Sequence, residues 1–145
     1  MNLQPLIDFY QQLTPEHIER MPELYSADAY FKDPFNEVRG VTAIQAIFRH
    51  MFQQLDSPRF VVTDRLTDAH GALLVWEFSF RVHRWRGEAI QTIRGASHLR
   101  FDGDGKVNYH RDYWDAAEEL YATLPLIGAI MRRLRSAFSA PAIHS

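Results

Sequence analysis

The chain of 145 residues contains no cysteine, which excludes a disulfide framework and a thiolate nucleophile and agrees with a reducing compartment. It has no excess of positive charge either, because 16 lysines and arginines stand against 18 acidic residues, for a formal net charge of -2. A nucleic-acid partner is therefore not expected. The N-terminal stretch lacks a basic start followed by an apolar run, so we predict no signal peptide, no stable membrane insertion and a cytoplasmic location.

Signatures of metals and cofactors are also missing. The seven histidines are scattered, no His-Glu-x-x-His spacing occurs, and one His-x-Asp pair cannot complete a coordination sphere alone. Gly103 and Gly105 lie between two predicted strands, which is typical of a hairpin and not of a phosphate-binding loop. We predict no metal site and no cofactor.

The first half of the chain has helical periodicity. Apolar residues at helical spacing predict a helix over residues 3–13 and a third helix over residues 44–55, after Gly40. Between them, Ile18, Met21, Leu24 and Tyr25 predict a short second helix. Pro22 costs an interior hydrogen bond, so this helix is expected to begin late, with the proline in its first turn.

The second half changes to strand-like composition. A short strand over residues 29–34 comes before the third helix, and longer stretches rich in Val, Ile, Phe, Trp and Thr lie near 59–67, 72–82, 89–101 and 106–114. Helices followed by hairpin-connected strands predict an α+β domain, in which a curved antiparallel sheet wraps over three N-terminal helices. We place this domain at residues 1–115. Helical periodicity returns at Ala116, so residues 116–145 are expected to form a C-terminal helical extension of the same domain.

The last predicted strand carries acid–base groups on one face. Side chains two apart on a strand point the same way, so His110, Asp112 and Trp114 share a face, and Arg111 lies on the other. A polar pair on a solvent-facing strand is one interpretation. A tryptophan beside the pair favours the other, a cavity with few polar groups.

A second carboxylate, Asp33, comes directly before Pro34. Carboxylates beside proline often accept hydrogen bonds within a turn. The aromatic neighbours Tyr30, Phe31 and Phe35 also allow a cavity mouth in which desolvation raises the pKa of Asp33 to a useful range. The sequence leaves both interpretations open.

Aromatic residues alternate along a neighbouring strand, at Trp76, Phe78 and Phe80. Such a row can line a cavity, but bulky aromatic side chains dominate core burial, so we assign the row to the core.

The order of the elements and two motifs resemble the nuclear transport factor 2-like superfamily, in particular its SnoaL-like polyketide cyclase and ketosteroid isomerase branches, over residues 3–115. The motif Phe31-Lys32-Asp33-Pro34, followed by Gly40, matches the place where the isomerase branch has its proton-abstracting aspartate. The segment from Gly105 to Asp112 resembles the SnoaL-like strand whose His-x-Asp carboxylate is the acid/base. The resemblance implies a cone-shaped fold, a ligand pocket and a homodimer.

One departure from the isomerase shifts the expected chemistry. Ser97 stands where that enzyme has a protonated aspartic acid in its oxyanion hole, and a serine donates more weakly. Tyr10 lies on the first helix, about where the family's tyrosine donor lies. The resemblance therefore favours a SnoaL-like arrangement centred on Asp112. Epoxide-hydrolase chemistry of this superfamily needs an inward arginine, and Arg111 is predicted to face outward.

The sequence predicts a cofactor-independent acid/base enzyme for a small hydrophobic ligand, with isomerisation, cyclisation, dehydration and epoxide opening as candidate reactions. Asp112 is the predicted general acid/base, His110 orients or assists it, and Asp33 is a second base. The predicted ligand contacts are Tyr10, Tyr30, Phe35, Ser97 and Trp114. The alternative is a non-catalytic ligand-binding or dimeric interaction domain of the same fold.

Overall fold

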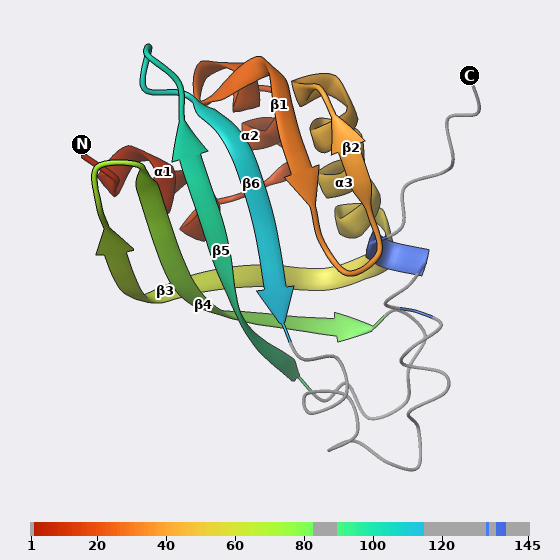
Figure 1. The fold of residues 1–145 in the computed structure, drawn as a ribbon. Coiled ribbons are helices and arrows are strands. Elements are labelled where there is room, and N and C mark those ends of the chain that lie inside the picture. Colours follow the sequence, from red (N-terminus) through yellow and green to blue (C-terminus); the bar gives the residue numbers. More distant parts are fainter. Residues whose placement is uncertain (1, 83–89, 115–132, 134–135, 139–145) are drawn as a thin grey trace.

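The computed structural model describes residues 2–82, 90–114, 133 and 136–138, and shows helices packed against one face of a curved, six-stranded sheet (Figure 1). The helices are α1 (Gln4–Gln11), α2 (Pro15–Ile18), a 3₁₀ helix η1 (Met21–Glu23) and α3 (Val41–Gln54). The strands are β1 (Tyr25–Lys32), β2 (Glu37–Arg39), β3 (Leu55–Thr67), β4 (Gly71–Val82), β5 (Gln91–Phe101) and β6 (Val107–Trp114). The predicted α+β cone architecture is confirmed.

The predicted second helix is wrong in detail, because the chain forms two short helices there. Pro22 has no N–H with which to continue α2, since that N–H would bond to the carbonyl of Ile18. The side-chain amide of Gln45 on α3 donates to the Ile18 carbonyl at 2.8 Å instead. Tyr25, assigned to the apolar stripe of this helix, is the first residue of β1.

The third helix begins and packs as its apolar spacing predicts. Gly40 precedes it with a φ of 106°, a conformation that favours glycine. Ile44, Ile47 and Met51 are buried on the side that faces the sheet. This apolar side of α3 forms one wall of the cone interior.

The sheet has the strand order β2-β1-β6-β5-β4-β3, and its last four strands are antiparallel neighbours as predicted. The expectation of an antiparallel sheet fails at one pair, because β1 lies parallel to β6. The two strands are joined by a long crossover through α3 and the β3–β5 hairpins, and only such a crossover can bring them parallel. The short strand β2 was not predicted; it pairs with the end of β1.

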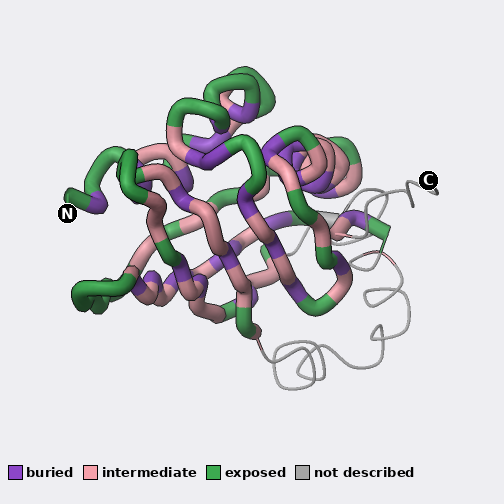
Figure 2. Tube along the Cα trace, turned by 45° about the horizontal axis from the view of Figure 1, so that its top comes forward, coloured by how far each residue is buried: buried purple, intermediate pink, exposed green. Residues whose placement is uncertain are grey.

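Burial alternates along the central strands, as Figure 2 shows in the purple and pink segments. The row of Trp76, Phe78 and Phe80 on β4 is buried, which agrees with its assignment to the core. Two register shifts interrupt the pairing of β3 with β4, and Ser57 beside one of them has a φ of 49°. Such irregularities bend a strand, which suits a sheet that curves around the helices.

Most of the predicted C-terminal extension lies outside the described residues. Of this part, Ser136–Phe138 are helical, and Ala137 is fully buried. The ring of Phe138 lies 6.1 Å from the ring of Phe35, centre to centre. The carbonyl of Ser136 contacts the imidazole of His50 on α3. This part of the tail therefore packs against the domain.

None of the helices within residues 2–82 and 90–114 is long and apolar enough to cross a membrane.

The position of Trp76 depends on a glycine on the next strand. Trp76 pairs with Gly95, and a β-carbon at Gly95 would lie 2.5 Å from the indole and 2.7 Å from the carbonyl oxygen of Tyr113. We expect Gly95→Ala to lower the free energy of unfolding by about 1–3 kcal/mol, measured by urea denaturation followed by circular dichroism. Gly103→Ala is the matched control, because nothing lies within 4 Å of its added carbon. Equal stability of the two variants would contradict this packing.

Candidate functional site

The interior of the cone holds a cavity between α3 and the inner face of the sheet. The space between the surrounding atoms, including the open solvent at its mouth, is about 450 Å³, but the enclosed part has room for little more than one water, so a larger ligand requires the rings around it to shift. The lining residues are Phe31, Asp33, Ile47, Phe48, Met51, Phe60, Trp76, Phe78, Ile93, Asp112, Trp114 and Phe138. The described lining is apolar except for two carboxylates and the indole N–H groups of two tryptophans.

A second space, of about 310 Å³, adjoins the first. It shares Asp112, Trp76 and two phenylalanines with the first cavity, and adds Tyr10, Ser97 and His110. Asp112 therefore borders both inner spaces, and it also lines a groove on the outer face of the sheet.

Strand β6 presents the predicted pair to this interior. His110 is only 2% exposed, and the Asp112 side chain is 17% exposed. Tyr113, between Asp112 and Trp114, faces the other side of the sheet and is 47% exposed. The period-two alternation of the strand thus directs the imidazole and the carboxylate inward.

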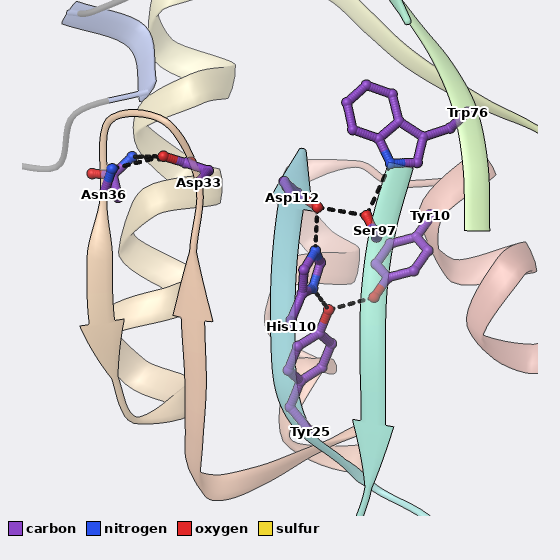
Figure 3. A network of polar contacts seen from close by, with 8 residues as sticks. All are labelled: Tyr10, Tyr25, Asp33, Asn36, Trp76, Ser97, His110 and Asp112. Carbon is purple, nitrogen blue, oxygen red and sulfur yellow. Dashed lines mark hydrogen bonds and ion pairs between the residues drawn. The ribbon is translucent and has the colours of Figure 1, made fainter. Parts of the chain in front are cut away.

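Two hydrogen bonds converge on one oxygen of Asp112 (Figure 3). The Ser97 hydroxyl donates to Oδ1 at 2.5 Å, and Nε2 of His110 lies 2.6 Å from the same atom. The indole N–H of Trp76 donates to the Ser97 oxygen at 2.9 Å, which leaves the serine proton for Asp112. Within the described part of the chain, Oδ2 of Asp112 has no hydrogen-bond partner. Oδ1 is therefore fixed by two hydrogen bonds, and Oδ2 is available to a ligand.

The hydrogen bonds continue from His110 to two buried phenols. Nδ1 of His110 lies 2.6 Å from the hydroxyl of Tyr25, which in turn contacts the hydroxyl of Tyr10. Burial raises the pKa of both phenols well above the ordinary tyrosine value, so both stay protonated. An ionised Asp112 can only accept, so Nε2 carries the imidazole proton and Nδ1 accepts from Tyr25. Every donor then points in one direction, from Tyr10 towards Asp112.

Asp33 has both of the surroundings that the sequence left open, a turn and a cavity wall. Its Oδ1 accepts hydrogen bonds from the backbone N–H groups of Phe35 and Asn36, both at 2.7 Å, and the Asn36 amide donates to Oδ2 at 3.1 Å. The same carboxylate lines the cavity. Burial is the main cause that raises the pKa of Asp33 to about 6; the charge of Asp112 contributes in the same direction, and the hydrogen bonds from Phe35 and Asn36 oppose the shift.

The parallel pairing of β1 with β6 brings the two carboxylates to the same place. Lys32 is the register partner of Arg111, so Asp33 and Asp112 follow at the next position of each strand. Side chains at equivalent positions of neighbouring strands share a face. Two motifs that are 79 positions apart in the sequence, at residues 33 and 112, therefore meet at one cavity.

The structure brings most of the predicted ligand contacts together, but not Tyr30. Trp114 lines the cavity, and Phe35 packs against it with ring centres 5.7 Å apart. Tyr30 stacks on Tyr109 at 5.4 Å on the outer face of the sheet. Its neighbour Phe31 takes the inward position, and adjacent strand residues face opposite sides. The interpretation of Tyr30 as a cavity residue is corrected accordingly.

Three residues of the site were missed by sequence reasoning. Tyr25 was assigned to a helix, Trp76 to the core alone, and Phe138 to an extension without a defined position. Alternation along the strands places both Ser97 and Trp76 on the inner face of the sheet. This pattern was a signal from which a hydrogen bond from the Trp76 indole to Ser97 could have been predicted. No local signal places Tyr25 beside His110, because that contact depends on the pairing of β1 with β6.

No arginine or lysine is among the described residues that line the two spaces. Arg111 lies on the outer face, with its guanidinium 4.7 Å from the ring centre of Tyr113. Within residues 2–82 and 90–114, no group of three His, Asp or Glu side chains is arranged to hold a metal ion.

The family of the chain follows from comparison with known proteins. The model of the SnoaL-like domain family matches residues 6–110, and the chain belongs to this family of the nuclear transport factor 2-like superfamily. This confirms the resemblance identified in the sequence. None of the curated proteins matches the chain.

Solved structures share the fold at low sequence identity. A hypothetical protein with a ketosteroid isomerase-like fold from Catenulispora acidiphila, in complex with trimethylamine, has 12% identity and a TM-score of 0.69, over 82% of this chain and 88% of that one. A candidate SnoaL-like polyketide cyclase from Jannaschia sp. CCS1 has 13% identity and a TM-score of 0.68, over 97% and 92%. An LEH-like epoxide hydrolase from M. tuberculosis has 15% identity and a TM-score of 0.67, over 90% and 92%.

The raised pKa of Asp33 predicts a pH-dependent cost to stability. The folded protein holds the Asp33 proton up to about pH 6, whereas the unfolded chain loses it near the ordinary value of 3.8. The buried charge of Asp33 therefore destabilises the folded protein increasingly as pH rises from about 4 to about 6, and the loss of stability reaches its full size above this range. Relative to wild type, Asp33→Asn is expected to gain up to about 3 kcal/mol of unfolding free energy between about pH 4 and pH 7.

Urea denaturation at several pH values, followed by circular dichroism, measures this difference. Asp104→Asn is the control, because Asp104 lies exposed in the β5–β6 turn. If the difference in unfolding free energy between wild type and Asp33→Asn does not change with pH, Asp33 is not buried as described.

Proposed function

We propose that this protein is a cofactor-independent acid/base enzyme that moves a proton on a small hydrophobic ligand in the cone, with Asp112 as the general acid/base. The observation that carries the proposal is the asymmetry of the Asp112 carboxylate. Ser97 and His110 hold Oδ1, Oδ2 has no hydrogen-bond partner in the described chain, and the side chain lines the apolar interior. A fixed carboxylate with one available oxygen is the geometry that a general base needs.

The residues around Asp112 support proton transfer in distinct ways. His110 and Ser97 orient the carboxylate, and Tyr25 fixes the imidazole in the tautomer that donates to it. Asp33, whose pKa is raised to about 6 by burial, holds a proton more readily than an ordinary aspartate and is placed to return one. Two carboxyl groups in different environments can divide the acid and base roles of one reaction between them.

The candidate reactions are isomerisation, intramolecular cyclisation and dehydration, because each needs a positioned base in a dry site. Proteins of this fold include a candidate polyketide cyclase and an epoxide hydrolase, which supports small-molecule chemistry in the cone. Epoxide opening through an arginine between two aspartates fits less well, since Arg111 faces outward.

A non-catalytic ligand-binding domain is the second candidate function. The narrowness of the cavity favours it, because the aromatic walls leave little free space for a substrate and its reacting groups. In that case the hydrogen bonds to Asp112 would satisfy a buried carboxylate without serving proton transfer.

Proton exchange on a ketone distinguishes the two functions. Incubation of 2-tetralone with the protein in D₂O, followed by ¹H NMR, measures abstraction of the proton beside the carbonyl. We expect Asp112→Asn to lower the protein-catalysed rate by about 100-fold or more, because the amide is not a base. Ser97→Ala keeps the carboxylate and loses one of its two donors, so it should retain more activity.

The control for this assay is Asp104→Asn, which should exchange 2-tetralone at the wild-type rate. If Asp112→Asn matches wild type as well, Asp112 is not the base and the binding function is favoured.

We also propose that the chain forms a homodimer through the outer face of β1 and β6. This face carries the exposed Tyr113 and the stacked pair of Tyr30 and Tyr109, and aromatic residues are enriched at interfaces. Size-exclusion chromatography with light scattering should give twice the 16.9 kDa chain mass, and Tyr113→Glu should shift the protein towards monomer. A monomer at all micromolar concentrations would refute the dimer.

A further inference from the structure

We propose that the cone selects a hydrophobic organic cation, with its positive group beside Asp33 and Asp112 and its apolar part against the aromatic walls. The inference rests on the proposed function, since it names the ligand class of the same site. It is drawn from the charge and the ring composition of the cavity.

The ionisable groups of the interior favour positive charge. Among the described residues, the two cavity spaces are lined by two aspartates, one histidine and one tyrosine, and by no lysine or arginine. His110 donates to Asp112 and accepts from Tyr25, an arrangement that a neutral imidazole satisfies fully. With both carboxylates ionised, the described groups that line the interior carry two negative charges and no positive charge from lysine or arginine.

The nearby cations are on the outside of the sheet. Lys32 pairs with Glu37 at 3.2 Å, and Arg111 lies over the ring of Tyr113. Arg94 lies 3.8 Å from Glu77. These three border a groove on the outer face that Asp33 and Asp112 also line, and their side chains alternate away from the inner cavity. They reduce the negative charge at the rim without entering the cavity.

The hydrogen-bond pattern of the carboxylates leaves one place for a cation. Asp33 accepts bonds from two backbone N–H groups and from Asn36, and these donors favour its ionised form. Asp112 lines the same cavity, and its Oδ2 has no hydrogen-bond partner among the described residues. Two ionised carboxylates that share an apolar space repel each other, so a positive group between them removes a cost that a neutral ligand leaves in place. An anionic ligand would add to the repulsion.

The walls suit the rest of such a ligand. Trp76 and Trp114 line the cavity together with Phe31 and Phe138. Aromatic faces attract alkylammonium groups through their ring quadrupoles, and tryptophan does so most strongly. Aromatic rings that surround a site with carboxylates at one end are a typical receptor for an alkylated amine.

A pair of probes with the same shape and different charge tests the inference. Benzyltrimethylammonium and neopentylbenzene differ only in the central atom of the branched group, nitrogen in one and carbon in the other. Each probe is titrated into the full chain, and the change in tryptophan fluorescence gives its dissociation constant. At pH 8 we expect the cation to bind at least about ten-fold more tightly than its neutral isostere.

The pH dependence and the variants test whether Asp33 and Asp112 supply the negative charge that attracts the cation. The preference for the cation should fall as pH is lowered from about 8 to about 5, because Asp33 takes up a proton near pH 6. Asp33→Asn and Asp112→Asn should each reduce the preference, and Asp104→Asn should leave it unchanged. Asp33→Asn should also remove most of the pH dependence.

Equal affinities for the two probes in the wild-type protein at pH 8, or tighter binding of the neutral one, would overturn the inference whether or not any variant folds. So would a cation preference that survives both Asp33→Asn and Asp112→Asn. Proton exchange on 2-tetralone uses a neutral ketone, so its loss in Asp112→Asn would uphold the proposed function even where the cation preference fails.

Discussion

The pairing of β6 with its two neighbours is the constraint on which the site depends. β6 lies antiparallel to β5, which sets Ser97 opposite Asp112, and parallel to β1, which sets Phe31 beside His110. A slip of one residue in either ladder would turn the inward side chains to the other face of the sheet. The hydrogen bonds to Asp112 and the meeting of the two carboxylates are therefore consequences of backbone register.

The buried polar chain from Tyr10 to Asp112 is tolerated because its donors and acceptors match. Each phenol, the imidazole and the serine hydroxyl uses its proton once, in the direction of the carboxylate. A buried polar group without a partner costs on the order of 1–3 kcal/mol, so a single break in such a chain is expensive. The requirement for complete pairing holds Asp112 in one orientation, and a base held in one orientation needs no reorganisation when it reacts.

Much of this arrangement could be predicted from local patterns. The period of two in β6 predicts that His110 and Asp112 share a face, and helical spacing predicts α1 and α3. The errors have a common cause, because they concern contacts between segments distant in sequence. The parallel pairing of β1 with β6 determines that Tyr25 reaches His110, and no property of residues 18–25 alone reveals it. Tyr30 and Phe31 are both aromatic, so composition could not tell which faces the cavity.

The two carboxylates differ in their hydrogen-bond donors, which fits two different roles toward a ligand. Asp33 is buried and accepts backbone hydrogen bonds that favour its charge. Asp112 accepts from neutral side-chain donors and borders both inner spaces. A cation near Asp33 would increase the acidity of a C–H bond a few atoms away, and Oδ2 of Asp112 is the available oxygen that could accept that proton. On this geometry, the charge that anchors the ligand also lowers the barrier to its deprotonation.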